Sequence, residues 1–201
     1  MRPDVIENKV KDRYGLTIRP LNMDDFENDV EHVRTVINNA WVGNWGFVPM
    51  SKAQAEHLAE DLKPIIDPRV AFLVEKDGEV VGFSLSIPDV NQVLHKIRPG
   101  PGRIRSYIGA GRMLLSMMLK RSNINRIRVA LLGVNEEYRA RGVDALLYYE
   151  TGKAAAANNY EWAELSWILE TNEAINRPIE LFESELYKRY RLYEKSLIQD
   201  A

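Results

Sequence analysis

The sequence predicts an α/β domain in which a sheet is flanked by helices, and three observations lead to this class. Two β-rich runs flank the dipeptide Asp77-Gly78, which is typical of a hairpin. Apolar residues recur at helical spacing from Phe26 to Trp41. The run 126–134 is apolar on both faces, as in a covered central strand, and a helical pattern follows it.

Composition and length fit one soluble globular domain. The 201 residues are 45% apolar and 28% charged. There is no Cys, which excludes disulfides and thiolate chemistry, and the three His residues lack metal-ligand spacing. No apolar run reaches the ~18 residues of a membrane span, so no membrane span is predicted. A polar N-terminus without a secretory signal makes a cytoplasmic location the default expectation.

The first elements can be placed in order. Residues 1–15 are predicted to be a polar arm or linker, and residues 16–20 a short strand. After the helix that starts near Phe26, Ser51 and Gln54 have the spacing of a capping box, which predicts a second helix. The hairpin follows, and then a short helix after Pro88.

Residues 104–120 form a further helical run with an apolar face and basic flanks. Three interpretations stay open: a helix packed on the sheet, a lid over a pocket, or a helix on a membrane surface. The net charge is −2, yet no acidic residue lies between Asp89 and Glu136, where nine positive charges occur. Such a block attracts an anionic ligand or surface.

The most informative stretch begins at the strand 126–134. It continues through Arg139-x-x-Gly142-x-Asp144 into a helical pattern up to residue 158. The first N–H groups of a helix have no partner inside it, and the helix dipole favours negative charge there. A strand, a short loop with one Gly and a helix N-terminus therefore predict an anion site.

The motif Arg139-x-x-Gly142-x-Asp144 resembles the pyrophosphate-binding loop of the GNAT superfamily of N-acetyltransferases, whose pattern is Gln/Arg-x-x-Gly-x-Gly/Ala. Residues 77–83 and 172–183 also resemble segments of that family. The resemblance implies a mixed, mostly antiparallel sheet of six to seven strands over residues 16–198. The run 104–120 would be a helical insertion between strands three and four.

The resemblance also implies acetyl-coenzyme A, or another acyl-coenzyme A, as cosubstrate and no metal. Family positions that contact the cosubstrate correspond here to Gly133, Val134, Arg139, Ala140, Arg141, Gly142, Val143, Asp144, Asn172 and Asn176. The aromatic loop between the first two helices, where the family shapes its acceptor site, would contribute Trp41, Asn44, Trp45 and Phe47.

Two positions depart from the family pattern. Asp144 puts a carboxylate beside the phosphate site, which predicts weaker phosphate binding; alternatively, it only complements its own helix dipole. Phe182 stands where the family has the Tyr that protonates the leaving thiolate. The candidate general bases are Glu164 and Glu170, or Glu75 if its strand turns it inward.

The preferred function is transfer of an acetyl or other acyl group from coenzyme A to a small-molecule amine. The alternative is a non-catalytic acyl-coenzyme A-binding or interaction module with the same fold. Binding to a membrane surface or to nucleic acid is the third class, and nucleic acid is not expected because Tyr107 is the sole aromatic residue in the basic block. A homodimer and a longer multidomain chain both stay open.

Overall fold

The computed structural model describes residues 10–95, 123–181, 184–191, 193 and 195. The chain divides into two compact units, Met1–Trp167 and Ile168–Ala201. The described strands are β1 (Leu16–Pro20), β2 (Ala71–Lys76), β3 (Glu79–Pro88), β4 (Arg126–Val134) and β5 (Trp162–Leu165). The longer helices are α2 (Phe26–Ala40), α3 (Lys52–Leu62), α6 (Val143–Ala157) and, in the second unit, α7 (Glu173–Leu181). Short helices are η1 (Pro68–Val70), α4 (Asn91–Leu94) and η3 (Glu136–Arg141).

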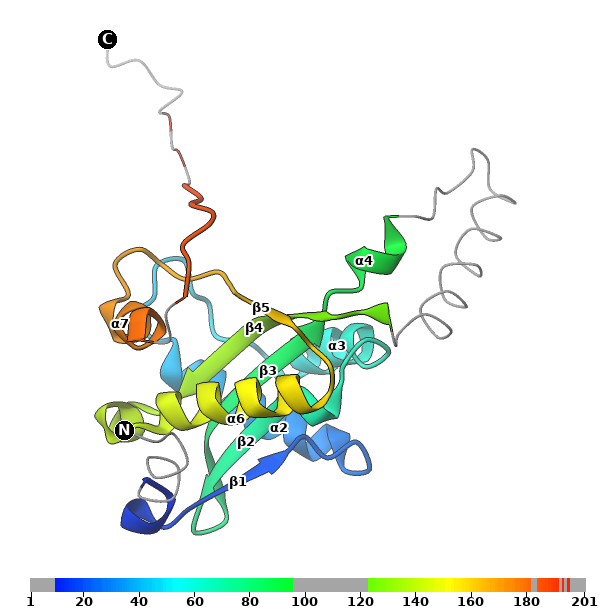
Figure 1. Ribbon diagram of the computed structural model, residues 1–201. Coiled ribbons are helices and arrows are strands. Elements are labelled where there is room, and N and C mark those ends of the chain that lie inside the picture. The colour runs from blue at the N-terminus through cyan, green and yellow to red at the C-terminus, as the bar shows by residue number, and fades with distance from the viewer. Residues whose placement is uncertain (1–9, 96–122, 182–183, 192, 194, 196–201) are drawn as a thin grey trace. The chain divides into compact units, whose positions relative to one another are not determined.

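The first unit is built on a five-stranded sheet in the order β1-β2-β3-β4-β5 (Figure 1). The pairings from β1 to β4 are antiparallel, and β4 pairs with β5 in parallel. The predicted mixed, mostly antiparallel sheet with flanking helices is therefore confirmed.

The predicted number of six to seven strands was wrong, because the structure has five in the residues it describes. The segment 187–195 does not form a strand at its described positions. Its aromatic residues are largely exposed, with Tyr190 at 66% and Tyr193 at 89%. A strand is stabilised when one of its faces is buried, and this charged segment offers no such face.

The β2–β3 hairpin forms as predicted at Asp77-Gly78. Both residues have positive φ, 51° for Asp77 and 87° for Gly78. A two-residue turn with two positive φ values is the type that matches the twist of the strands. The capping box also forms: the Ser51 hydroxyl accepts from the N–H of Gln54 at 3.3 Å, and the Gln54 side chain accepts from the N–H of Ser51 at 2.9 Å.

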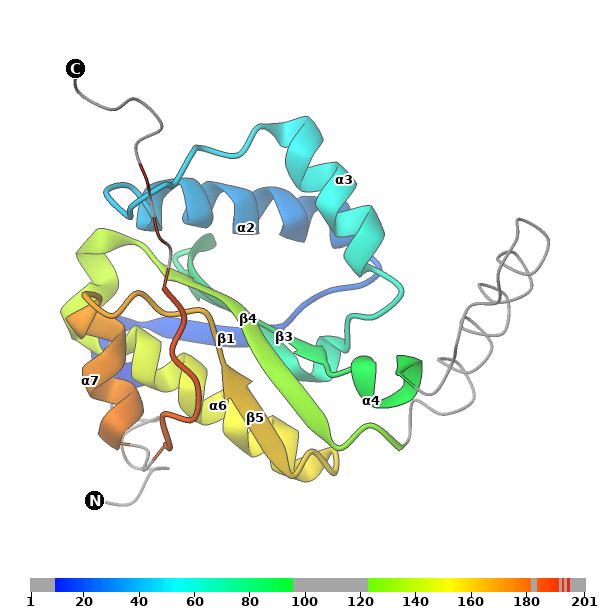
Figure 2. The ribbon, with the colours of Figure 1, turned by 90° about the horizontal axis from the view of Figure 1, so that it is seen from above.

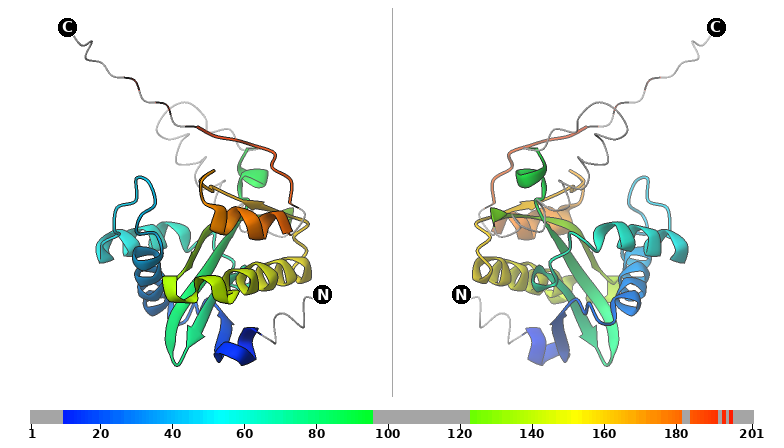
Figure 3. Two further views of the ribbon diagram at one scale, coloured as in Figure 1. Left: turned by 90° about the vertical axis from the view of Figure 1, so that its left-hand side faces the viewer. Right: turned by 90° about the vertical axis from the view of Figure 1, so that its right-hand side faces the viewer.

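Helices cover both faces of the sheet. Figures 2 and 3 show α2 and α3 on one face and α6 on the other. On the α2 side, Ile37 and Leu73 belong to one buried apolar cluster with Phe83. On the α6 side, Val143 and Leu147 pack in a second cluster with residues of β1 to β4. A central sheet buried on both faces explains why the strands read as nearly continuous apolar runs.

Part of the predicted arm is helical and joins the first unit. Residues 10–14 form a helical turn, and Val10 and Tyr14 pack against the cluster beneath α6. Lys11 forms an ion pair with Glu150 of α6 at 3.2 Å. The predicted helical insertion at 104–120 lies outside the described residues. Within the described ranges, no helix has both the length and the apolar character needed to cross a membrane.

Candidate functional site

The site is built around the end of β4, where its pairing with β5 stops. The parallel register joins Arg126–Val129 to Trp162–Leu165 and goes no further. β4 itself continues to Val134, held on its other side by β3. The last five residues of β4 therefore extend past the end of β5, and among the described residues no strand pairs with this edge.

The backbone groups of this edge can be assigned from the β3–β4 register. Residues of an antiparallel strand turn their N–H and C=O groups alternately toward one neighbour and away from it. The N–H of Asn135 donates to the carbonyl of Val81 on β3 at 2.9 Å. By alternation, Leu132 and Val134 turn their groups toward the edge that β5 has left. The indole N–H of Trp41 confirms this for Leu132, because it donates to the Leu132 carbonyl at 3.1 Å.

The chain enters α6 directly after this edge. The predicted loop 135–141 folds as the short 3₁₀ helix η3, and Gly142 then adopts a left-handed φ of 79°. This conformation favours Gly, and an added Cβ would lie 3.4 Å from Val10. Within the part of the chain that the structure describes, no side chain caps the N-terminus of α6. The uncapped helix end fits the predicted anion site.

Arg139 has a different role in this structure from the one that the motif implies. Its Nε donates to the carbonyl of Val134 at 3.3 Å, and its Nη2 donates to the carbonyl of Ala40. The guanidinium therefore joins the C-terminus of α2 to the end of β4, where it complements the negative end of the helix dipole. It organises the walls of the site, and phosphate binding by this side chain stays a prediction.

Arg141 lies between two aromatic rings. Its guanidinium carbon is 5.0 Å from the ring centroid of Tyr138 and 5.7 Å from that of Tyr14. Both distances are within the range of cation–π contacts. The two rings hold Arg141 in the segment that leads into α6, and binding of an anion by its guanidinium stays a prediction. The sequence motif did not reveal either tyrosine as part of the site.

Asp144 lies in the first turn of α6 and faces along the helix toward Tyr148. Burial, and after it the negative charge of Asp144, raises the pKa of Tyr148 above its ordinary value. A carboxylate in the first turn complements the helix dipole, as one sequence interpretation expects. The same charge would repel a phosphate at the helix end, as the other expects.

The aromatic loop after α2 has an inner and an outer part. Trp41 and Phe47 meet edge to face, with ring centroids 5.9 Å apart and planes at 72°, and both pack against the α2-side core. Trp45 is 73% exposed. Asn44 is half-buried, and its N–H donates to the carbonyl of Trp41 at 3.0 Å. Of the four predicted acceptor residues, the structure brings Trp41 to the free edge of β4.

The candidate bases in the first unit are both held in ion pairs. Glu164 accepts from Arg128 at 2.7 Å, and Glu75 accepts from Arg19 at 2.6 Å. Glu164 lies opposite Arg128 in the register, so it is about 20 Å along β4 from Val134.

Three of the predicted residues, Glu170, Asn172 and Asn176, belong to the second unit. Glu170 forms an ion pair with Arg189 at 3.2 Å. The side chain of Asn176 donates to the carbonyls of Leu169 and Glu170, both at 3.2 Å. The carbonyl of Asn172 accepts from the N–H of Asn176 at 3.0 Å. Phe182 is outside the described residues, and among those described no group of His, Asp and Glu could hold a metal ion.

Comparison with known proteins identifies relatives of about twice the length. No protein-family model matches the chain. The bacterial ceramide synthase of Caulobacter vibrioides is 31% identical over 201 residues, which cover 97% of this chain and 51% of that protein. Protein YghO of Escherichia coli is 33% identical over 189 residues, which cover 92% of this chain and 47% of that protein. The chain thus spans about half the length of these curated relatives.

Solved structures identify the fold. The aminoglycoside N-acetyltransferase AAC(6')-Iy, in complex with a bisubstrate analogue of CoA, superposes with a TM-score of 0.56 and 14% identity. The match covers 90% of this chain and 98% of that one. The chain therefore has the fold of the GNAT N-acetyltransferases, which confirms the resemblance seen in the sequence at the level of the fold.

Proposed function

We propose that the protein transfers an acyl group from acyl-coenzyme A to the nitrogen of an amine. The observation that carries the proposal is the free edge of β4 beside the uncapped N-terminus of α6. The helix end and Arg141 would hold the pyrophosphate, and the free edge would pair with the amide groups of the pantetheine arm. The name of one relative, the bacterial ceramide synthase, supports this chemistry, because a ceramide is the amide of a fatty acid with a long-chain amino alcohol.

The backbone of β4 would supply the electrostatic part of catalysis. The N–H of Val134 turns toward the free edge, where it would donate to the thioester carbonyl as negative charge develops on that oxygen. Arg139 fixes this residue by binding its carbonyl. The indole of Trp41 bounds the same edge through its bond to Leu132, so the amine would approach along the aromatic loop.

Calorimetric titration with acetyl-coenzyme A tests the cosubstrate, and Asp144 offers a sharper variant than the arginines. Removing its carboxylate in Asp144→Ala removes a repulsion of about 1 kcal/mol or more at an exposed helix end, so affinity should rise about fivefold. Asp24→Ala makes the same charge change at an exposed residue before α2 and should leave affinity unchanged. If neither the unmodified protein nor any variant binds acetyl-coenzyme A, this function is excluded. If Asp144→Ala binds with the same affinity as the unmodified protein, the phosphates do not bind beside Asp144.

The proton acceptor is proposed to be Glu170 or water, since Glu164 lies far along β4 in its ion pair. Thiol release measured over a panel of amines, with the matched variants Glu170→Gln and Glu164→Gln, separates these cases. We expect Glu164→Gln to retain kcat within about threefold. A 100-fold lower kcat in Glu170→Gln is the effect expected when a general base is lost. If Glu170→Gln retains its kcat, water is the proton acceptor.

A non-catalytic acyl-coenzyme A-binding module is the second candidate. It is favoured by one observation, the commitment of the Arg139 guanidinium to backbone carbonyls that hold α2 and β4 together. Calorimetry and thiol release distinguish the candidates, because a binding module would take up acyl-coenzyme A and release no thiol with any amine.

A further inference from the structure

The helical turn at residues 10–14 is attached to α6 by a charged contact and by apolar packing. The ammonium group of Lys11 is 3.2 Å from a carboxylate oxygen of Glu150, and the two side chains are only 24% and 12% exposed. Val10 and Tyr14 pack against the buried apolar cluster that α6 shares with the sheet. Figure 1 shows the turn in dark blue near the start of α6. The turn is therefore docked on this helix.

The same turn contacts the two residues that precede α6. A Cβ built on Gly142 would lie 3.4 Å from Cγ2 of Val10, which is van der Waals contact. The ring centroid of Tyr14 is 5.7 Å from Cζ of Arg141, and that of Tyr138 is 5.0 Å from the same carbon. The proposed function assigns the pyrophosphate to Arg141 and to the helix end that follows Gly142. The turn thus contacts the segment that would bind the cosubstrate.

The two rings at Arg141 differ in what they attach it to. Tyr138 lies in η3, so its ring belongs to the same short segment as the guanidinium. Tyr14 comes from the docked turn, a distant part of the sequence, and therefore ties the guanidinium to the folded core. A flexible arginine loses conformational entropy when it binds a ligand, and holding it in place beforehand reduces that cost.

We propose that Tyr14 is a positioning residue for the cosubstrate: the docked turn holds Arg141 in the orientation in which it binds the pyrophosphate of acyl-coenzyme A. The inference rests on the proposed function, which places the pyrophosphate at the start of α6. It also implies coupling in both directions. If docking of the turn strengthens the binding of coenzyme A, bound coenzyme A must strengthen the docking of the turn by the same factor.

Two substitutions at Tyr14 separate its aromatic face from its bulk. Tyr14→Phe keeps the face, whereas Tyr14→Leu keeps apolar packing and removes the face on which the cation lies. Calorimetry with coenzyme A should give a Kd about threefold higher for Tyr14→Leu, as expected for one lost cation–π contact, and a nearly unchanged Kd for Tyr14→Phe. An unchanged Kd in Tyr14→Leu, or equal losses in both variants, would overturn the inference.

A double-mutant cycle tests whether Tyr14 acts through Arg141. Arg141→Ala should raise the Kd for coenzyme A, and adding Tyr14→Leu should raise it no further. A second threefold loss in the double variant would mean that Tyr14 acts without Arg141 and would overturn the inference. Tyr149→Leu is the matched control, because it removes a ring that lies 5.6 Å from Lys153 further along α6, and it should leave the Kd unchanged.

Hydrogen exchange measures the same coupling without any substitution, so it decides the question if a Tyr14 variant does not fold. Saturating coenzyme A should slow amide exchange over residues 10–15 at least about threefold and leave exchange at the hairpin turn 77–78 unchanged. Unchanged exchange over residues 10–15 with coenzyme A bound would overturn the inference. If coenzyme A does not bind the unmodified protein at all, the proposed function itself is rejected, which is a distinct result.

Discussion

At the scale of single residues, Gly133 shows how closely the end of β4 is packed. A Cβ built on Gly133 would lie 2.7 Å from Cε1 of Phe83 and 3.4 Å from Cγ1 of Val36. Phe83 is 1% exposed and Val36 is fully buried, so an added methyl group would have to displace side chains of the core. The missing side chain lets α2 approach the strand where the proposed thioester site begins.

Substituting Gly133 by Ala should therefore destabilise the protein. We expect a loss of about 1–3 kcal/mol in the free energy of unfolding, measured by urea denaturation, because the core must shift to accept one methyl group. Gly152→Ala is the matched control. Gly152 lies in α6 with nothing within 4 Å of an added Cβ, so the same change there should stabilise by about 0.5–1 kcal/mol through helix propensity. Equal effects at both sites would contradict the packing argument.

Asp29 makes the stability of the protein depend on pH. It is 2% exposed and accepts from Arg19 at 2.6 and 2.8 Å and from the N–H of Asn22 at 2.8 Å. Burial alone would raise the pKa of Asp29, but the bonds from Arg19 and Asn22 outweigh it and hold the pKa below its ordinary value. A lowered folded-state pKa contributes stability above the unfolded pKa of about 4, and this contribution is lost as the pH falls through the folded value.

Replacing Asp29 by Asn should thus lower the free energy of unfolding most at neutral pH. Breaking a buried ion pair from one side costs on the order of 3 kcal/mol. At pH 7 we expect Asp29→Asn to show this loss in the free energy of unfolding, and at pH 2 to 3 the gap to the unmodified protein should narrow. Asp24→Asn, at an exposed position, should change little at either pH. A gap that is the same at both pH values would refute the role of the Asp29 charge.

The backbone features of the candidate site could be predicted from the sequence, but the partners of its side chains could not. The motif located Gly142 and its helix because both follow from local backbone chemistry. The acceptors of Arg139 include a carbonyl 99 residues away, and the indole of Trp41 bonds to a carbonyl 91 residues away. Such contacts arise when α2 packs on the sheet, and no spacing within one segment encodes them.

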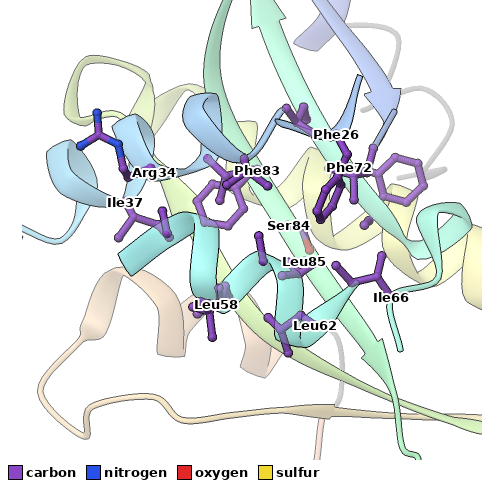
Figure 4. Close-up of a pocket in the computed structure, with 18 of the residues that line it drawn as sticks. Phe26, Arg34, Ile37, Leu58, Leu62, Ile66, Phe72, Phe83, Ser84 and Leu85 are labelled. Atoms are coloured by element: carbon purple, nitrogen blue, oxygen red, sulfur yellow. The ribbon is translucent and has the colours of Figure 1, made fainter. Parts of the chain in front are cut away.

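At the scale of elements, α3 lines an apolar pocket together with α2 and the sheet (Figure 4), and the start of α3 depends on one cap. Ser51→Ala removes the hydroxyl that accepts from the N–H of Gln54 and should cost about 1 kcal/mol. Ser51→Asp keeps a side-chain acceptor and should retain most of the stability. Thermal unfolding followed by circular dichroism measures both. A cost in Ser51→Asp as large as in Ser51→Ala would show that the cap is unimportant here.

Elements with strong local chemistry were predicted well, and elements that depend on tertiary packing were not. The Asp77-Gly78 turn and the Ser51 cap are fixed by residues within four positions of each other. Side chains over residues 162–169 alternate in the way that is typical of a strand, yet β5 ends at Leu165, and Trp167 is 82% exposed. The alternating pattern continues past the point where the sheet offers an edge to pair with.

At the scale of the whole molecule, the buried core belongs to one unit. The apolar clusters on the two faces of the sheet, and a third around Val70 and Ile127, draw all their buried members from Leu16 to Tyr160. The described residues of the unit Ile168–Ala201 contribute none of them. Burial of apolar surface is the dominant favourable term in folding, so the first unit holds most of the stability.

A chain truncated after Trp167 should therefore fold alone. We expect a cooperative urea transition and a free energy of unfolding within about 2 kcal/mol of the full chain, because no buried cluster loses a member. The free edge of β4 and the N-terminus of α6 are retained, so coenzyme A should still bind. Thiol release should fall if Glu170 accepts the proton, since that residue is removed. If the truncated chain shows no cooperative transition, the second unit is required for the core to fold. If the truncated chain keeps full thiol release, Glu170 is not the proton acceptor.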